Sequence, residues 1–207
     1  MSTAGGSAAR WGQELRAGAR RGPWRRLLTV LGVRAHTRRA DAQAASCDAG
    51  AVGEARTAVL LAPLQAAGWR VLHDRRIPGA RTANADHIVI TPAARVYLLD
   101  SKQWSGKHDR TVHVQDGQLM HGSVDRSRSV RSLLFETGLV ERALGCPVNP
   151  LIVMHNAPVA GGSFKVDGIP VLPADRLVQA LVLNEGPRDP GARLLAVRAE
   201  RVLPPYR

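Results

Sequence analysis

Apolar residues recur at helical spacing in two long segments of the chain and in short strand-like runs around them. In residues 52–67 and 125–144 they lie three and four positions apart, which places them on one face of a helix. Runs rich in β-branched and other apolar residues predict strands at 69–73, 86–90, 96–102, 111–115, 118–121, 151–154 and 169–172. With a short final helix at 174–184, this order of elements predicts an α/β domain built on a mixed β-sheet.

Turn residues support these boundaries. Asp116 and Gly117 stand between two strand-like runs, and Asp-Gly is a strong signal for a two-residue hairpin. The five residues 91–95 are expected to join strands 86–90 and 96–102 as a second hairpin. Gly145 is expected to end the helix at 125–144.

Charge divides the 207 residues into a basic N-terminal arm and a packed domain. The formal charge is +12, from 29 Lys and Arg against 17 Asp and Glu, and such a surplus favours polyanionic partners. Residues 1–41 hold nine arginines but only two acidic residues. We therefore expect a disordered or partly helical arm at 1–45, a folded domain at 46–186, and a tail rich in Pro and Arg at 187–207.

Three roles stay open for the arm. It can be a solvated tail, a sequence-independent phosphate-binding segment, or a helix on a membrane surface built from residues 24–33. As a phosphate-binding segment it would use these arginines to contact DNA: Arg20, Arg21, Arg25, Arg26, Arg38 and Arg39. The chain contains 26 Arg but only three Lys. Such a skew is typical of a GC-rich gene, so arginine content alone is weak evidence for nucleic-acid binding.

The cysteines and the lack of long apolar runs exclude several classes of protein. Only Cys47 and Cys146 are present, so a disulfide framework is excluded and a reducing, cytoplasmic compartment is expected. No run of about 18 apolar residues occurs, so we expect no stable membrane insertion. The apolar stretch 27–33 is short and flanked by arginines, which does not fit a signal peptide.

Three ionisable residues on two adjacent expected strands are the strongest candidates for chemistry. Asp100 and Lys102 lie two residues apart, so their side chains point to the same face of a strand. If Ile90 pairs with Val96, directly opposed residue numbers sum to 186. Asp86 then lies opposite Asp100, where two carboxylates would repel unless a cation or a proton lay between them. Such oxygen-rich sites suit Mg²⁺ or Mn²⁺ and favour metal-assisted phosphodiester hydrolysis, with the Lys102 ammonium near the attacking water or the developing charge.

The sequence around these residues resembles the nuclease-related domain (NERD) family, which belongs to the PD-(D/E)xK, restriction-endonuclease-like superfamily. The resemblance rests on Gly53-Glu54 in the first helix and on three segments, VLHDRRIPG (71–79), ADHIVI (85–90) and VYLLDSKQWSGK (96–107). It extends over roughly residues 49–185. A DH pair that opens one strand, followed by a D-x-K that ends the next, is more specific than a lone D-x-K.

The resemblance implies a restriction-endonuclease-like mixed β-sheet core flanked by helices, and Mg²⁺- or Mn²⁺-dependent cleavage of DNA. It implies roles for four residues: Glu54 is the acid on the first helix, Asp86 the first metal-binding carboxylate, and Asp100 with Lys102 the D-x-K pair. Asp100 replaces the commoner glutamate and shortens the reach of the carboxylate. Because double-strand cleavage by one such site usually needs a second copy, the resemblance also raises a homodimer as an assembly to test.

Other interpretations of the same residues stay open. Asp100 and Lys102 could form a surface ion pair, and Glu54 could be an ordinary first-turn acid. His87 and Gln103 alternate to the other face of their strands and are expected to be structural. For the whole chain, the alternative to a nuclease is a DNA-binding or assembly module that keeps the fold and does not cut.

Overall fold

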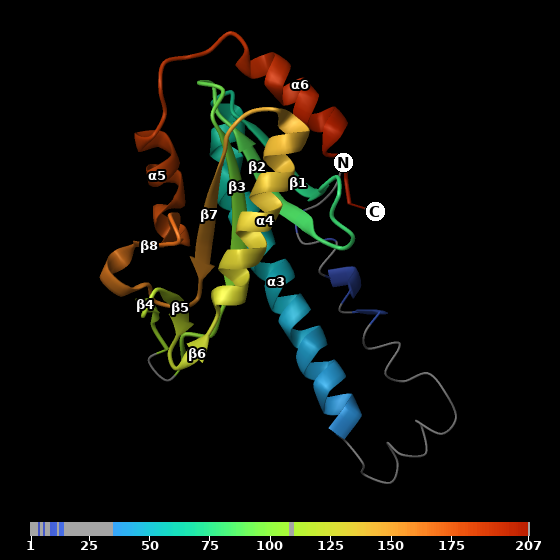
Figure 1. Ribbon diagram of the computed structural model, residues 1–207, viewed down its shortest axis with the longest axis vertical. Helices are drawn as coiled ribbons and strands as arrows, with labels where there is room; N and C mark the ends of the chain where they lie inside the picture. Colours follow the sequence, from blue (N-terminus) through green and yellow to red (C-terminus); the bar gives the residue numbers. More distant parts are fainter. Residues whose placement is uncertain are drawn as a thin grey trace.

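A six-stranded mixed sheet forms the centre of the computed structural model (Figure 1). The strands lie in the order β1-β2-β3-β7-β9-β8. Their bounds are β1 Arg70–Arg76, β2 Asn84–Ile90, β3 Val96–Gln103, β7 Val148–His155, β9 Ile169–Pro173 and β8 Phe164–Val166. The pairs β3–β7 and β7–β9 are parallel, and the other neighbouring pairs are antiparallel. The prediction of a mixed sheet is confirmed.

The structure describes residues 35–107 and 110–206, together with Ala4, Gly6, residues 9–11, Gln13 and Glu14, and for residues 35–46 it describes the backbone alone. Four of the arginines expected to bind nucleic acid lie outside the described residues: Arg20, Arg21, Arg25 and Arg26. The other two, Arg38 and Arg39, lie in the first turns of a helix, where the side chains are not described.

Helices cover both faces of the sheet, so the domain has three layers (Figure 1). Their bounds are α3 Ala35–Ala66, α4 Ser127–Leu144, α5 Leu177–Leu183 and α6 Ala192–Val202. Two single 3₁₀ turns, η2 (Ala160–Gly162) and η3 (Ala174–Arg176), precede β8 and α5. No helix in the described part of the chain combines the length and the apolar character needed to cross a membrane.

Alternation of side chains along β2 and β3 divides the core in two. Ile88, Ile90 and Leu98 belong to a buried cluster with residues of α4 and α6. Val89 and Leu99 belong to a second cluster with residues of α3 and α5. Neighbouring residues of one strand therefore serve opposite layers, which is the condition for a sheet buried on both faces. This architecture is consistent with the expected restriction-endonuclease-like fold.

A second, three-stranded sheet lies between β3 and α4 in the sequence. It consists of β4 (Val112–Gln115), β5 (Gln118–His121) and β6 (Val124–Asp125). Its first hairpin turns at Asp116 and Gly117, whose φ angles of 52° and 76° are both positive. A two-residue turn of this kind matches the right-handed twist of the strands. The hairpin predicted from Asp-Gly is confirmed.

Helix α3 begins at Ala35, well before the expected start at residue 52. It crosses the expected boundary between arm and domain at residues 45–46. Its first half carries many alanines and no apolar stripe. Helix propensity extends this part of the helix without leaving a periodic signal in the sequence. Gly68, with a φ of 92°, follows the end of the helix, and glycine adopts such a positive angle without strain.

The segment 187–207, expected as a tail, contains helix α6, which packs on the domain. Ala199 and the following Leu203 are fully buried in the cluster shared with α4. The helix carries apolar residues at 194–197, 199 and 202 and is amphipathic, a helical signal that the expectation of a tail overlooked. The expectation of a Pro- and Arg-rich tail is therefore corrected for residues 192–203, which form part of the core.

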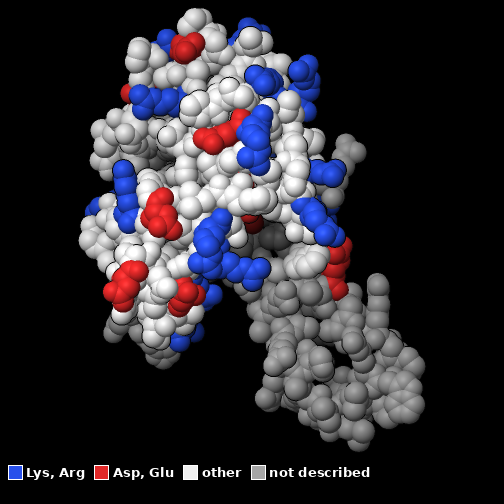
Figure 2. Space-filling model, viewed as in Figure 1, with Lys and Arg blue, Asp and Glu red and all other residues white. Residues whose placement is uncertain are grey.

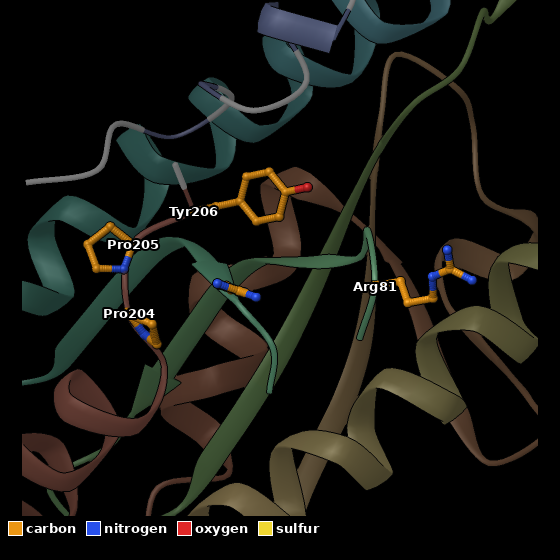
Figure 3. A pocket seen from close by; sticks show the side chains of 5 residues that line it. Arg81, Pro204, Pro205 and Tyr206 are labelled. Carbon is orange, nitrogen blue, oxygen red and sulfur yellow. The ribbon is translucent and has the colours of Figure 1, made fainter. Parts of the chain in front are cut away.

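The last described residues pair with β1 at the edge of the sheet (Figure 3). The backbone N–H of Arg76 donates to the Pro204 oxygen, and that of Tyr206 donates to the Asp74 oxygen, both at 2.9 Å. This pairing covers backbone groups that an edge strand would otherwise expose. The same segment lines a pocket of about 370 Å³ with Arg81. In Figure 3 the Arg81 side chain points away from Tyr206, so these two groups do not converge on one ligand.

Candidate active site

The pairing of β2 with β3 follows the register predicted for the two acidic strands. Ile90 pairs with Val96 and His87 pairs with Leu99, so opposed residue numbers sum to 186. The ladder ends there. Beyond it, the carboxylate of Asp86 replaces the backbone of β2, because its Oδ2 accepts a hydrogen bond of 2.9 Å from the backbone N–H of Ser101.

Asp100 and Lys102 lie side by side on the same face of β3, as strand alternation predicts. The Nζ atom of Lys102 donates a hydrogen bond of 2.6 Å to Oδ1 of Asp100. The side chains are 27% and 14% exposed for Lys102 and Asp100, so the pair is partly withdrawn from water and still accessible. Burial alone would lower the pKa of Lys102, but the Asp100 and Asp86 carboxylates outweigh it and raise that pKa, which keeps the ammonium charged.

Negative charge accumulates around Asp86. Burial is the largest cause that raises the pKa of its carboxyl well above the ordinary value, followed by the charges of Glu54 and Asp100. The Lys102 ammonium and the N–H of Ser101 act in the opposite direction and do not compensate fully. A carboxylate in this position gains from any additional cation or proton.

Glu54 reaches this end of the sheet from α3. It is 5% exposed, and it lies on the inner stripe of α3 with Thr57 and Leu61, both fully buried. The preceding Gly53 lets the helix approach β3 closely, because a Cβ at that position would stand 3.2 Å from the Cβ of Gln103. The Gly53-Glu54 pair noted in the sequence thus has a physical basis, since the small residue brings the acidic one near Asp86.

A further carboxylate, Glu136, faces the Asp100–Lys102 pair from α4. Burial and the charge of Asp100 raise the pKa of Glu136 to about 7, while Lys102 acts to lower it. Glu136 is not among the candidate residues predicted from the sequence. Glu136 lies one turn from Val140 and from Leu133, on the inner half of a helix whose apolar stripe was recognised. An acidic residue at such a position is the signal that could have found it.

These groups line an open cleft of about 450 Å³ between β3 and the first turns of α4. The charged residues that line the cleft are Asp100, Lys102, Asp125, Arg126, Arg128 and Glu136. Figure 2 shows basic side chains at the lower, N-terminal end of α4, along the rim of a hollow in the surface. Acidic and basic groups therefore meet in one accessible recess.

The carboxylates do not form a closed metal-binding cage. Within residues 35–107 and 110–206, no three His, Cys, Asp or Glu side chains converge closely enough to hold a metal ion. Asp86 and Asp100 contribute oxygen donors, the type that Mg²⁺ and Mn²⁺ prefer. The chemistry of the donor set would fit such an ion, although Oδ1 of Asp100 accepts a hydrogen bond from Lys102.

The other face of the same strands carries hydrogen-bonded polar pairs without a carboxylate. His87 is fully buried and lies with its Nδ1 atom 2.7 Å from Nδ1 of His73. Burial lowers the pKa of His87 to about 3, so the ring is neutral. Gln103 also lies on this face, with Arg56 donating to its side-chain oxygen at 3.4 Å. The orientation expected for His87 and Gln103 is confirmed.

The three-layer fold and the D-x-K strand beside a helical acid define a domain of the restriction-endonuclease-like class. Comparison with protein-family models agrees, because residues 49–155 match the model of the nuclease-related domain, NERD. The match covers just over half of the chain, and the chain belongs to this family. Comparisons with curated proteins and with solved structures gave no match.

Proposed function

We propose that this chain is a metal-dependent nuclease that hydrolyses phosphodiester bonds of DNA, with Mg²⁺ or Mn²⁺ as cofactor. One observation carries the proposal. Asp86, Asp100 and Lys102 meet at one end of the sheet, and Asp100 and Lys102 line an open cleft there. The carboxylates around Asp86 bear more negative charge than Lys102 offsets. A structural ion pair would need only one of the two aspartates.

The proposed roles follow from the charges of the side chains. Asp86 and Asp100 would hold the ion, and Glu54 would assist through the ion or its water. A bound divalent ion would polarise a phosphoryl oxygen and lower the pKa of the attacking water. Lys102, kept charged by Asp100, would stabilise negative charge that develops on the phosphoryl group. Its raised pKa favours this role over that of a general base.

Cleavage of plasmid DNA with and without Mg²⁺ or Mn²⁺ tests the proposal. Asp100→Asn and Lys102→Ala should abolish cleavage while DNA affinity, measured by mobility shift in EDTA, stays close to that of the parent. Asp116→Asn and Lys165→Ala are matched controls, because both residues are exposed and lie on other elements. Equal cleavage by the parent and the two site variants would refute the nuclease site.

A non-catalytic DNA-binding or assembly module is the second candidate. It is favoured by the ion pair of Lys102 with Asp100, which occupies a carboxylate oxygen that an ion would need. It is also favoured by the lack of three converging ligands among the described side chains. Retardation of DNA without nicking at any tested Mg²⁺ or Mn²⁺ concentration would support this candidate instead.

The proposal extends to partners and compartment. The basic arm, with Arg20, Arg21, Arg25 and Arg26, would add sequence-independent affinity that falls steeply with salt. A homodimer would supply the second site for double-strand cleavage, and sedimentation at micromolar concentration tests it. With only two cysteines in the chain, a reducing, cytoplasmic compartment is proposed.

A further inference from the structure

Arg126 is held in the wall of the cleft by an aromatic residue that follows the D-x-K strand. Its guanidinium carbon lies 5.2 Å from the centre of the Trp104 ring. Trp104 is itself fixed by His121, whose ring centre is 5.2 Å away at an interplanar angle of 31°. The Nε2 atom of His121 is hydrogen-bonded to the Ser105 oxygen at 2.9 Å. Arg126 thus packs on the ring of Trp104, which lies two residues after Lys102 and is held in place by His121.

Beyond its contact with the Trp104 ring, the guanidinium of Arg126 is not balanced by an opposite charge in the described part of the protein. No carboxylate there forms an ion pair with it, and its Nε, although buried from water, has no hydrogen-bond acceptor among the described residues. The neighbouring Asp125 is engaged elsewhere, since its Oδ1 accepts the backbone N–H of Ser127, the first residue of α4, at 2.7 Å. A buried donor without an acceptor is a position where a ligand oxygen would be stabilising.

The cleft needs such a cation if it is to receive a polyanion. Its three carboxylates, Asp100, Asp125 and Glu136, would repel a nucleic-acid backbone, and the Lys102 ammonium is already paired with Asp100. Only two of the basic residues that line the cleft remain, Arg126 and the exposed Arg128. Arginine is well suited to this task because its planar donors match phosphate oxygens.

We propose that Arg126, supported by Trp104, binds a backbone phosphate of the nucleic acid beside the Asp100–Lys102 pair, with Arg128 as a second contact. The inference rests on the proposed function and adds the groups that position its substrate. Arg126 contacts the substrate, whereas Trp104 acts through Arg126 as a positioning residue. Phosphate contacts fix the register of a nucleic acid without reading its bases, so binding at this wall is independent of sequence.

Fluorescence anisotropy with a fluorescein-labelled 30-nucleotide DNA, single- or double-stranded, in EDTA tests the inference on the full chain. Arg126→Gln should weaken binding by about 10-fold and reduce the slope of log affinity against log salt by about one. Arg142→Gln is the matched control, since this residue is exposed on the last turn of the same helix. It should change affinity less than twofold. Trp104→Leu should lose affinity as Arg126→Gln does, and Trp104→Phe should restore most of it.

The outcomes separate this inference from the nuclease proposal, because binding is measured without a metal. A loss smaller than threefold for Arg126→Gln with an unchanged salt slope, or an equal loss for Arg142→Gln, overturns the inference whatever the protein cleaves. Arg126-dependent binding without cleavage under any metal refutes the nuclease and leaves the phosphate contact standing. If Arg126→Gln unfolds, as judged by its melting temperature, Arg128→Gln provides the test, and an unchanged affinity of that variant counts against the proposal.

Discussion

The two faces of the sheet at the end of β3 use buried polar groups in opposite ways. On the α3 face, the Ser101 hydroxyl donates to the Thr57 hydroxyl at 2.8 Å, and Thr57 is hydrogen-bonded to Nε2 of His155 at 2.7 Å. Burial lowers the pKa of His155, so this chain of groups is neutral. These three polar side chains are paired with one another, although Nε2 of His87 on the same face is buried without a hydrogen-bond partner among the described residues.

On the α4 face, the groups carry charge that their neighbours do not offset. Burial and the charges of Glu54 and Asp100 raise the pKa of Asp86, and burial followed by Asp100 raises that of Glu136 to about 7. Matched neutral pairs stabilise a fold, while unmatched charge in an open cleft costs stability and is typical of a functional site. Burial of polar residues alone therefore does not distinguish the proposed site from the rest of the core, whereas unbalanced charge does.

The largest expected effect is on the rate of DNA cleavage, which should depend on the α4 face and not on the α3 face. Lys102→Met removes the only ammonium of the cleft and should lower the rate of DNA cleavage by about 10²–10³-fold, the range found when one stabilising group is removed from a transition state. Thr57→Val, on the other face, should change the rate less than twofold per folded molecule. Initial rates of plasmid nicking at saturating Mg²⁺ measure both. A comparable loss in the Thr57 variant would show that the faces are not functionally distinct.

The free energy of unfolding should show the opposite dependence, because a change on the α3 face should lower it and a change on the α4 face should raise it. Thr57→Val leaves Ser101 and His155 without their buried partner and should lower the free energy of unfolding by about 2 kcal/mol. Asp86→Asn keeps an acceptor for the Ser101 N–H and removes a repelled carboxylate, so at pH 8 it should raise that free energy by about 1 kcal/mol. Urea denaturation at pH 8 measures both changes. Destabilisation by Asp86→Asn would mean that the cluster carries no excess negative charge.

Local signals in the sequence are sufficient for the part of the site that lies on one hairpin. Strand alternation and a short connection determine that Asp100 and Lys102 share a face, and the predicted register is present from the pair Ile90–Val96 to the pair His87–Leu99. Asp86 follows directly beyond this ladder. The Asp-Gly turn and the glycine that ends α4 follow from backbone preferences. Each of these features depends on residues close together in the chain.

The groups missed from the sequence depend on contacts between distant segments. Glu136 and Arg126 enter the cleft because α4 packs across the end of β3, and no local pattern states which part of α4 lies there. The small residues of α6 become core residues only because α4 and the sheet provide the surface that buries Ala199. Which of these side chains enter the cleft or the core is determined by tertiary packing, and the spacing of hydrophobic residues in the sequence does not reveal it.

Lowering the pH should reduce the free energy of unfolding, because His87 on the α3 face is held neutral in the folded protein. The pKa of His87 is about 3 in the folded protein, mainly through burial, and its ordinary value is 6.5. The folded state therefore binds fewer protons than the unfolded state between these values. The contribution of His87 is complete above pH 6.5 and is lost as the pH falls, by about 1 kcal/mol for each pH unit below 6. Urea denaturation of the parent and of His87→Leu between pH 7 and pH 5 measures the slope, which should be smaller in the variant. Equal slopes would show that His87 is protonated in the folded protein.

The smallest expected effect concerns the close approach of α3 to β3. Gly50→Ala meets no atom within 4 Å and should stabilise the helix by up to about 1 kcal/mol through helix propensity alone. Gly53→Ala gains the same propensity, but its Cβ must displace the Gln103 side chain, 3.2 Å away, so the free energy of unfolding should be about 1 kcal/mol lower than in the Gly50 variant. Because Glu54 follows on the same turn, the rate of cleavage should fall severalfold in the Gly53 variant only. Thermal denaturation and nicking rates of the two variants measure the difference. Identical behaviour of both would show that Glu54 does not depend on this approach.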